Sequence, residues 1–417
     1  MADSKSNSYQ LGDVLVNKLN LIGEGKTRDI IPQVIELSLF EDIMTPYMNL
    51  ILQINDAIGL LRTFPIIGDE MIELEFQTPG RDVYKAKFRV YEVVVGSATD
   101  NQSAIGYTLN CVSEEAFKNS VFNVDKGYKD TIDNIIHDIV HDSLKSKKKI
   151  FFEPSKGVQE ITFTRRKPFE GINFLRRRAV SQKYTSSTYF FFENKYGYNF
   201  NTLEGLMDQN KGKKGDKIFT RHQVTNDENQ NPQNFRQIIS YNVGRQFNML
   251  SSLSLGALNG IHQTFDIFRK EFKEKKYTIK DFPEFKNAEE KGAVSPFDTR
   301  TITEFSKDTS TYYFNISNSS APDTYLNDAL MKKIAFTSIQ LNGSIDIQAH
   351  GDSSMTIGDV IELKMPRSDG TTKRNVSQEP LQNGNYILTK MHHFIQFSSG
   401  RPKYTMVFSA IRGIYKQ

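Results

Sequence analysis

The feature that most constrains this chain is an alternation of apolar and polar residues through its first 115 positions. Residues 70–78 read EMIELEFQT, with Ile, Leu and Phe at every second position, and residues 83–95 and 104–112 repeat this period of two. Because successive side chains of a strand point to opposite faces, the pattern predicts a sheet with one buried and one solvated face. Strands this numerous and closely spaced are typical of a β-barrel or β-sandwich.

The middle of the chain changes to a helical period. Residues 127–144 place isoleucine and valine at i, i+3, i+4 and i+7 spacing, which predicts an amphipathic helix. Residues 168–180 predict a second helix, because Pro168 suits a first helical turn and apolar residues follow on one stripe. An aromatic hairpin is expected over residues 188–203, with a turn at Asn194–Gly197.

Regular strand patterns return near the C-terminus, after a helix predicted over residues 324–340. Between residues 218 and 320 the pattern supports one strand, at 237–243, and the charge-rich residues 271–290 support no element. The four C-terminal strands are expected at residues 344–348, 360–365, 386–397 and 403–411.

Charge and cysteine content exclude several classes of protein. The net charge of +4 over 417 residues is too even for a dedicated nucleic-acid binder, so we expect no specific nucleic-acid binding. The charge is nevertheless segregated, with a local −6 over residues 1–100 and a local +11 over residues 144–221, which favours electrostatic docking to a partner or simply a solvated basic face. The single cysteine, Cys111, cannot form an internal disulfide or a cysteine zinc site, and it lies on an apolar strand face.

The sequence also gives no sign of a membrane or of secretion. No window holds 18 consecutive apolar residues, so we expect no transmembrane helix and no membrane partner. The first ten residues, MADSKSNSYQ, are polar and lack the apolar stretch of a secretory signal. Synthesis in a reducing compartment fits the single cysteine and the lack of a secretory signal.

Catalytic and metal-binding motifs are not apparent. The sequence has no P-loop, no GxSxG elbow and no HExxH motif. His137 and His141 are four residues apart with Asp133 one turn earlier, but two imidazoles alone favour a solvated helix face over a metal site. His392 and His393 are adjacent in a predicted strand and therefore point to opposite faces. We expect no enzyme activity, no metal and no cofactor.

The candidate interface residues are Arg176, Arg177 and Arg178, which end the second predicted helix. Three consecutive guanidinium groups suit a phosphate or a partner lined with carboxylates. They also suit the wet side of a helix, and the sequence leaves both interpretations open.

Several segments, taken in order, resemble the baseplate hub protein of contractile-tailed, T-even-like bacteriophages. This family is related to the N-terminal hub part of the type VI secretion spike (VgrG-like) proteins. The resemblance also includes the helices and the aromatic hairpin of the middle region, and it covers about three quarters of the chain. The terminal segments that carry it are residues 34–42 (VIELSLFED), 50–56, 64–70 (FPIIGDE), 355–366 (MTIGDVIELKMP), 385–393 and 404–412.

The resemblance implies a mainly β (α+β) fold with two interleaved antiparallel β-barrel domains, a few amphipathic helices and an additional peripheral β-rich domain. Residues 1–124 would form the first hub barrel, and residues 125–208, with helices, would begin the second. Residues 209–321 would add strands and the peripheral domain, and residues 322–417 would complete the second barrel.

The resemblance also implies a function without catalysis. Hub proteins form a homotrimer whose pseudo-sixfold ring adapts the sixfold tail tube to the threefold central spike. The implied partners are a second and third copy of the chain, the spike protein, the tail tube and baseplate wedge proteins, and the tape-measure protein. The implied location is the tail baseplate of the virion, after assembly in the host cytoplasm.

Other functions remain open at this point. The hub could belong to another contractile injection or type VI-like system. A β-rich receptor or glycan-binding tail module is a second alternative, because the aromatic residues 189–192 could stack on sugar rings, although the chain has no tryptophan. A cell-wall hydrolase or protease is a third, but it would need a converging acid or nucleophile–base pair, and the sequence offers none.

Overall fold

The computed structural model describes the two ends of the chain most fully. The residues that it describes are 10–64, 66–95, 105–184, 186–209, 217–220, 236–243, 254, 259–266, 269–278, 312–317, 329–335, 337, 344–365, 383–397 and 400–412.

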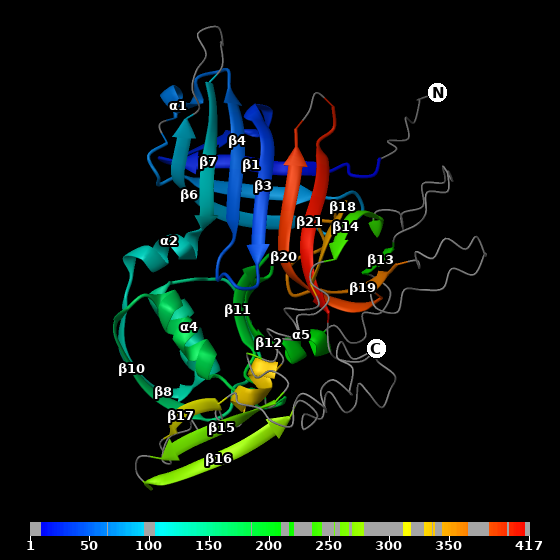
Figure 1. Cartoon of the computed structure of the whole chain (residues 1–417). Helices are drawn as coiled ribbons and strands as arrows, with labels where there is room; N and C mark the ends of the chain where they lie inside the picture. The colour runs from blue at the N-terminus through cyan, green and yellow to red at the C-terminus, as the bar shows by residue number, and fades with distance from the viewer. Residues whose placement is uncertain are drawn as a thin grey trace, which may run out of the picture.

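A 13-stranded sheet dominates the fold (Figure 1). Its path runs β14-β18-β21-β20-β3-β4-β7-β6-β5-β1-β2, with β19 pairing β20 and β13 pairing β19. The mainly β class expected from the sequence is confirmed. From the first part of the chain the sheet takes β1 (Leu15–Gly23), β2 (Lys26–Asp29), β3 (Val34–Asp42), β4 (Asn49–Asp56), β5 (Met71–Gln77), β6 (Tyr84–Val95) and β7 (Ile105–Ser113). Two short elements, η1 (Ile31–Gln33) and α1 (Leu60–Thr63), lie between these strands.

The remaining strands of this sheet come from the second half of the chain. They include the four predicted C-terminal strands, and β14 lies where a strand was predicted at 237–243. The bounds are β13 (Ile218–Thr220), β14 (Ile238–Val243), β18 (Ser344–His350), β19 (Val360–Lys364), β20 (Gly384–Gln396) and β21 (Lys403–Arg412).

The two ends of the chain are joined within this sheet. Strand β20 pairs antiparallel with β3, with His392 opposite Phe40. At the other side of the curled sheet, Asp13 forms a bridge with Lys403 just before β1. The backbone N–H of Tyr404 donates to the carbonyl oxygen of Gly12 at 2.7 Å. Eight strands, β1-β5-β6-β7-β4-β3-β20-β21, therefore curl until the first and last of them meet.

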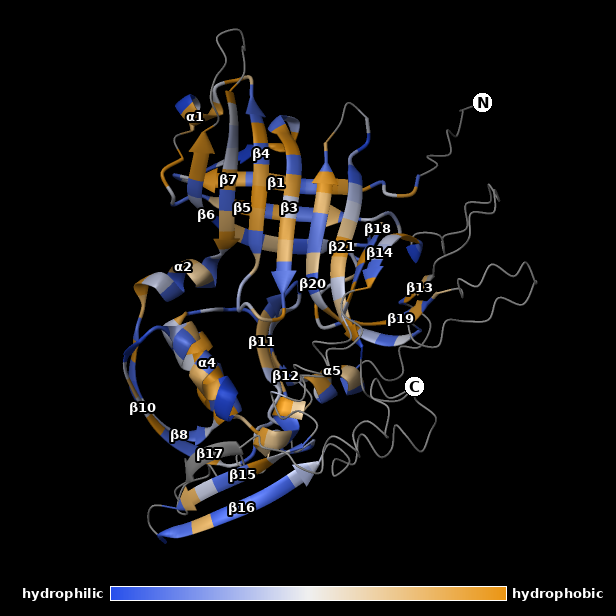
Figure 2. Ribbon diagram, viewed as in Figure 1, coloured by the Kyte–Doolittle hydropathy of each residue, from blue (hydrophilic) through white to orange (hydrophobic). Residues whose placement is uncertain are grey.

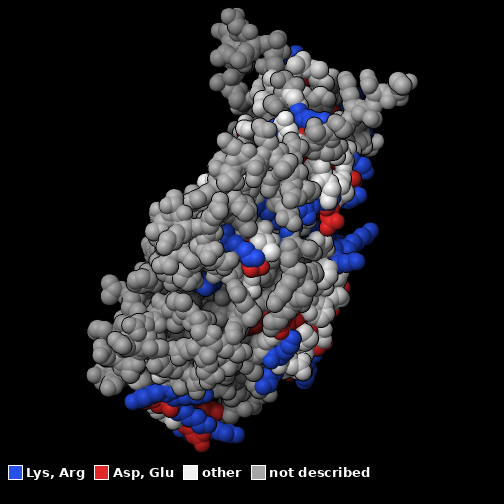
Figure 3. All heavy atoms as spheres, turned by 90° about the vertical axis from the view of Figure 1, so that its right-hand side faces the viewer, with Lys and Arg blue, Asp and Glu red and all other residues white. Residues whose placement is uncertain are grey.

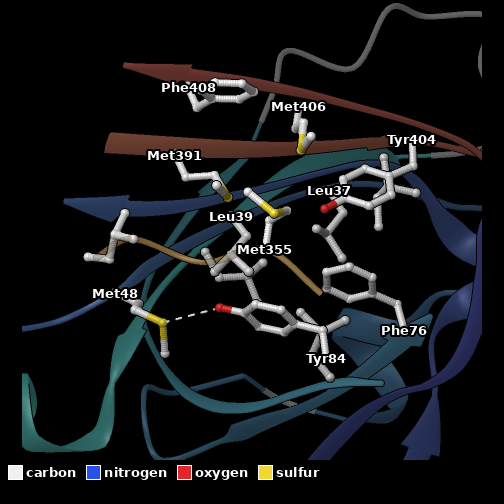
Figure 4. Close-up of a cluster of buried hydrophobic side chains, with 14 of the residues drawn as sticks. Leu37, Leu39, Met48, Phe76, Tyr84, Met355, Met391, Tyr404, Met406 and Phe408 are labelled. Atoms are coloured by element: carbon white, nitrogen blue, oxygen red, sulfur yellow. Dashed lines mark hydrogen bonds between the residues drawn. The ribbon is translucent and has the colours of Figure 1, made fainter. Parts of the chain in front are cut away.

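The inward face of the curled sheet forms the main core. Figure 2 shows the alternation of apolar and polar residues along β3, β4 and β7, as the period of two predicted. Figure 4 shows side chains from both ends of the chain packed together, among them Leu39, Phe76, Met391 and Phe408. All four are at most 2% exposed. The core is therefore shared between the N-terminal and C-terminal segments.

A second hydrophobic core lies in the middle of the chain, below the curled sheet in Figure 1. It packs α3 and α4 against the aromatic hairpin β11–β12, with Ile135, Leu175 and Phe200 fully buried. The elements of this region are α2 (Glu114–Val121), β8 (Val124–Thr131), α3 (Ile132–Asp138), η2 (Ile139–Ser143), β9 (Ile150–Phe152), β10 (Val158–Arg166), α4 (Pro168–Arg178), β11 (Tyr189–Asn194), β12 (Gly197–Thr202) and α5 (Leu203–Gln209).

The first predicted helix was placed too early. Residues 124–131 form β8, paired with β10, and the helix begins only at Ile132, after Thr131 in an extended conformation. Gly127 disfavours a helix, and β8 buries Val124 and Tyr128. The isoleucine stripe itself was predicted correctly, since Ile132, Ile135 and Ile136 are all buried.

A three-stranded sheet of order β16-β15-β17 lies at the lower end of the molecule. Its strands are β15 (Asn259–Asp266), β16 (Glu271–Thr278) and β17 (Tyr312–Ser317). No element was predicted at β16, because six of its eight residues are exposed and no buried face marks the strand. Figure 3 shows basic and acidic side chains intermixed at this end.

The predicted domain boundaries stay a prediction. What the strand pairing adds is that residues 384–412 hydrogen-bond directly to strands of the first 124 residues. Of the helix predicted over residues 324–340, the described residues 329–335 and 337 are helical, and the other positions lie outside the described residues.

Candidate interaction surfaces

The predicted arginine cluster lies on α4, which packs on the second core. Pro168 occupies the first turn, and Phe169, Ile172 and Leu175 form the buried stripe that the sequence predicted. The three arginines fall in the last turn, where cations interact favourably with the helix dipole. The helix dipole therefore explains in part why arginines occur at this position, even when no binding partner is present.

The three guanidinium groups have different surroundings. Arg177 is exposed, whereas Arg176 and Arg178 are half-buried. Arg178 lies over the ring of Phe174, with Cζ 4.4 Å from the ring centroid, and Arg166 of β10 approaches the same ring at 5.0 Å. Stacking on an aromatic ring fixes a guanidinium plane and leaves its edge free to donate hydrogen bonds.

A fourth cation joins this cluster from a distant part of the chain. Burial, together with the positive charges of Arg176 and Arg177, lowers the pKa of Lys333 to about 8. Burial and the neighbouring Arg177 also lower the pKa of Arg176. Lys333 was not predicted from the sequence, because 156 residues separate it from Arg177 and no local pattern connects them.

The adjacent Lys332 is also buried, but it has polar and acidic partners. The Nζ of Lys332 donates to the carbonyl oxygen of Tyr184 at 3.0 Å and lies 3.9 Å from a carboxylate oxygen of Glu204. Within the part of the chain that the structure describes, neither Lys333 nor Arg176, Arg177 or Arg178 forms an ion pair with an acid. No carboxylate among the described residues therefore offsets the repulsion between these cations, although Arg176 donates a hydrogen bond to Oδ1 of Asn173 at 2.9 Å.

A buried polar network holds the two ends of the chain together inside the curled sheet. Glu41 of β3 accepts hydrogen bonds from the Tyr84 hydroxyl at 2.5 Å, the Thr356 hydroxyl at 2.5 Å and the Ile357 backbone N–H at 3.0 Å. Nε2 of His393 lies 3.2 Å from the same carboxylate, and both side chains are 0% exposed. Burial raises the pKa of Glu41, but the bonds from His393, Thr356 and Tyr84 outweigh it and leave the pKa lowered.

A second buried charge network joins α2 to the aromatic hairpin. The Nζ of Lys148 lies 2.5 Å from carboxylate oxygens of both Glu115 and Glu193. Burial raises the pKa of Glu193, whereas Lys148 holds that of Glu115 below its usual value despite burial. Burial alone would lower the pKa of Lys148, but the two carboxylates raise it. One lysine therefore compensates two acids in an apolar setting.

The remaining residues considered in the sequence occupy structural positions. Cys111 is 1% exposed, and burial raises the pKa of its thiol. The rings of His137 and His141 lie 4.4 Å apart on α3 and η2, away from the buried isoleucines. As predicted, His392 and His393 point to opposite faces, with His392 stacked on Phe40 at 4.3 Å outside the sheet.

The aromatic hairpin is not a sugar-binding platform. Every residue of β11 and β12 is buried. The rings stack on one another, with Tyr189 and Phe200 at 4.4 Å and Phe191 and Tyr198 at 5.1 Å between centroids. The stacking role that these rings were given in the glycan-binding alternative is wrong, because their faces are already occupied.

No group of three or more His, Cys, Asp or Glu among the described residues is arranged to hold a metal ion. No helix among them has the length and apolar character needed to cross a membrane.

Comparisons with known proteins place the fold. No family model matches the sequence, and no curated protein matches it. The 43 kDa tail protein of prophage MuSo2 from Shewanella oneidensis matches with a TM-score of 0.55 and 9% identity, over 95% of this chain and 98% of that one. The tail protein from Neisseria meningitidis MC58 matches with a TM-score of 0.56 and 8% identity, over 95% and 96%.

A third match is weaker. The E. coli c3393 protein, a type VI secretion component described as similar to T4 tail proteins gp27 and gp5, has a TM-score of 0.44 at 9% identity, over 97% of this chain and 78% of that one. We base the fold on the first two proteins. The chain has the fold of phage tail proteins, and the fold that the resemblance implied is confirmed.

Proposed function

Proceeding from this tail-protein fold, we propose that the chain is a structural protein of a phage tail, and specifically its baseplate hub. The observation that carries the proposal is the extent of the match, which spans 95% of this chain and 98% of the MuSo2 tail protein. Because the match covers nearly all of both chains, the likeness extends to the complete architecture and is not limited to one domain. At 9% identity it concerns the fold, and the role in the tail is our inference.

The proposed assembly is a homotrimer with pseudo-sixfold symmetry that adapts the sixfold tail tube to the threefold central spike. Sheet edges that are unpaired among the described strands support an oligomer, because unpaired strand edges need covering. Strands β2 and β14 end the path of the large sheet, and β16 ends the small one. The proposed partners are two further copies, the spike, tube and wedge proteins and the tape-measure protein, within the baseplate of the virion.

A role without catalysis fits the buried acid–histidine pair. Glu41 and His393 form an arrangement that could serve acid–base chemistry, but both side chains are 0% exposed. Among the described residues, their hydrogen bonds go to other core groups. A general acid or base must reach a substrate within hydrogen-bond distance. The pair therefore supports a structural role for this site.

The test is the solution mass of the purified chain by light scattering after size exclusion, alone and with the co-encoded spike protein. The monomer mass is 47.7 kDa, so we expect a trimer at three times this value, about 143 kDa, either alone or upon addition of the spike. A chain that stays at 47.7 kDa in both conditions would overturn the hub proposal.

A further inference from the structure

We propose that Arg166 and Arg178, both held on the ring of Phe174, form a docking site for an acidic segment of a neighbouring protein. The ligand chemistry is a pair of carboxylates presented by that segment. Of the three arginines predicted from the sequence, only Arg178 belongs to this site. The proposal rests on the proposed function in one respect only, that the neighbour belongs to the same tail assembly.

The two guanidinium groups share one aromatic ring. Cζ of Arg178 lies 4.4 Å from the centroid of the Phe174 ring, and Cζ of Arg166 lies 5.0 Å from it. The Phe163 ring lies 6.0 Å from that of Phe174 at an interplanar angle of 81°, and it gives Arg166 a second contact at 5.7 Å. Such contacts fix the guanidinium planes and leave their N–H edges able to donate to a carboxylate.

A β-bulge directs Arg166 to this position. The register of β10 against β8 shifts between Phe163 and Arg166, and Arg165 has a φ of 46°, in the left-handed region. The backbone N–H of Arg165 donates to Oδ1 of Asp125 at 2.6 Å, which holds the bulge. This conformation is unfavourable for residues other than glycine, and bulges re-aim the side chains beside them. The fold therefore maintains a strained backbone next to Arg166.

Neither arginine of the site has an anionic partner. Within the ranges that the structure describes, Arg166 and Arg178 form no ion pair and donate no side-chain hydrogen bond. Both are half-buried. On the large sheet, by contrast, even the exposed Lys85 lies 3.2 Å from a carboxylate oxygen of Glu75. Two half-buried like charges on one ring repel each other, and carboxylates would relieve this repulsion.

Acidic side chains beside the site favour a short acidic protein segment over nucleic acid. Asp125 is hydrogen-bonded to the residue before Arg166, and both Asp125 and Glu170 are exposed. Glu170 lies one turn before Phe174 on α4. A nucleic acid presents a continuous line of phosphates, which proteins match with a stripe of cations. The two acids would repel such a line, whereas two carboxylates on a protein segment need only the two guanidinium groups.

The test uses the full chain and the fluorescein-labelled peptide GSEEDEGS, with binding followed by anisotropy and GSQQNQGS as the uncharged counterpart. The site variant carries Arg166→Gln and Arg178→Gln. The matched control carries Lys147→Gln and Lys149→Gln, two exposed lysines of the same basic region, so both variants lose two positive charges. We expect the dissociation constant to rise about tenfold or more in the site variant and less than about threefold in the control.

A third variant separates a built site from general electrostatic attraction. Phe174→Leu keeps every charge but removes the ring on which both guanidinium groups lie. We expect binding of GSEEDEGS to weaken about threefold to fivefold, because the arginines would then have to be ordered upon binding. Wild-type affinity in this variant would refute the role of the ring.

Four other results would overturn the proposal: no binding of GSEEDEGS, equal binding of GSQQNQGS, an equal loss in the two double variants, or tighter binding of labelled dT10 that is lost in the site variant. The last result would assign the site to nucleic acid. Circular dichroism establishes that each variant is folded, and if the double variant is not, Arg178→Gln against Lys149→Gln gives the same comparison. Because the peptide test does not depend on oligomeric state, its failure is distinguishable from failure of the trimer measurement.

Discussion

Replacing Glu41 tests whether its buried network holds the two ends of the chain together. In Glu41→Leu the carboxylate is lost, and the Tyr84 hydroxyl, the Thr356 hydroxyl and the Ile357 N–H lose their acceptor. The Ile357 N–H cannot rotate to another partner, and His393 also loses its contact. Breaking a buried charged network by removing one member costs about 3–5 kcal/mol of unfolding free energy.

Glu41→Gln should be milder, because an amide can place its oxygen toward Thr356 and Ile357 and its NH₂ toward the other side. There the Tyr84 hydroxyl can rotate to accept, and the His393 ring can accept in its other tautomer. We expect a loss of about 1–2 kcal/mol, the range for one charge-assisted hydrogen bond. Because of this geometry, Glu41→Leu should lose more unfolding free energy than Glu41→Gln.

The assay is urea unfolding followed by far-ultraviolet circular dichroism, with hydrogen exchange of β3 and β20 as the local readout. The matched control is Glu36→Leu, since Glu36 lies on the same strand, is half-buried and points to the outer face. A surface change of this kind should stay within about 0.5 kcal/mol of wild type. If Glu41→Leu lies within 1 kcal/mol of wild type by the same measure, the network does not join the two segments as argued.

The pH dependence of stability tests the role of Glu41 independently. The pKa of Glu41 is lowered in the folded chain from a reference of 4.5, because bonds from His393, Thr356 and Tyr84 outweigh burial. A lowered carboxyl pKa contributes stability above the unfolded value, and this contribution is lost as the pH falls below it. Wild type should therefore lose more stability between pH 6 and pH 3 than Glu41→Gln does. Equal losses would contradict an ionised Glu41.

Two further substitutions test other parts of the fold. An added Cβ at Gly351 would lie 1.9 Å from Cδ1 of Tyr404, so Gly351→Ala should lower stability by about 1–3 kcal/mol in urea unfolding; an unchanged midpoint would contradict the close packing. Lys148→Met leaves the buried Glu115 and Glu193 uncompensated and should cost about 3–5 kcal/mol at pH 8. Because protonation removes their repulsion, this loss should shrink at pH 5, and a loss independent of pH would refute the assignment.

The strands were predictable because their signal is local. Each strand buries one face, so apolar residues occupy every second position of segments such as residues 70–78. The start of α3 was not predictable from its isoleucines, because the stripe says which residues are buried and not where the preceding strand ends. Strand β16 was missed for the opposite reason, since it exposes both faces. Periodicity thus detects half-buried elements and little else.

The candidate site, too, was predictable from the sequence only where its residues are neighbours in the chain. The run of three arginines was visible in the sequence, and the structure places it on the last turn of α4 as expected. Lys333 could not have been added, because its position depends on tertiary packing alone. The pairing of Glu41 with His393 spans 352 residues and likewise leaves no local trace. Contacts between residues that are far apart in the sequence could be identified only from the three-dimensional structure.

The distance between these partners also suggests why the polar network lies where it does. Pairing β20 with β3 closes a chain segment of about 350 residues, and closure entropy grows by about 0.6 kcal/mol for each doubling of loop length. Relative to a ten-residue hairpin, a flexible chain of this length would lose about 3 kcal/mol more on closure. The Glu41 network makes its bonds across that long-range junction, and the loss expected on breaking it is of the same size. A slip of one residue would already turn the buried Leu37 and Leu39 of β3 out of the core, so apolar packing excludes it. A slip of two residues would keep this face buried but would move Glu41 away from its four partners, so the polar network distinguishes the register where apolar packing does not.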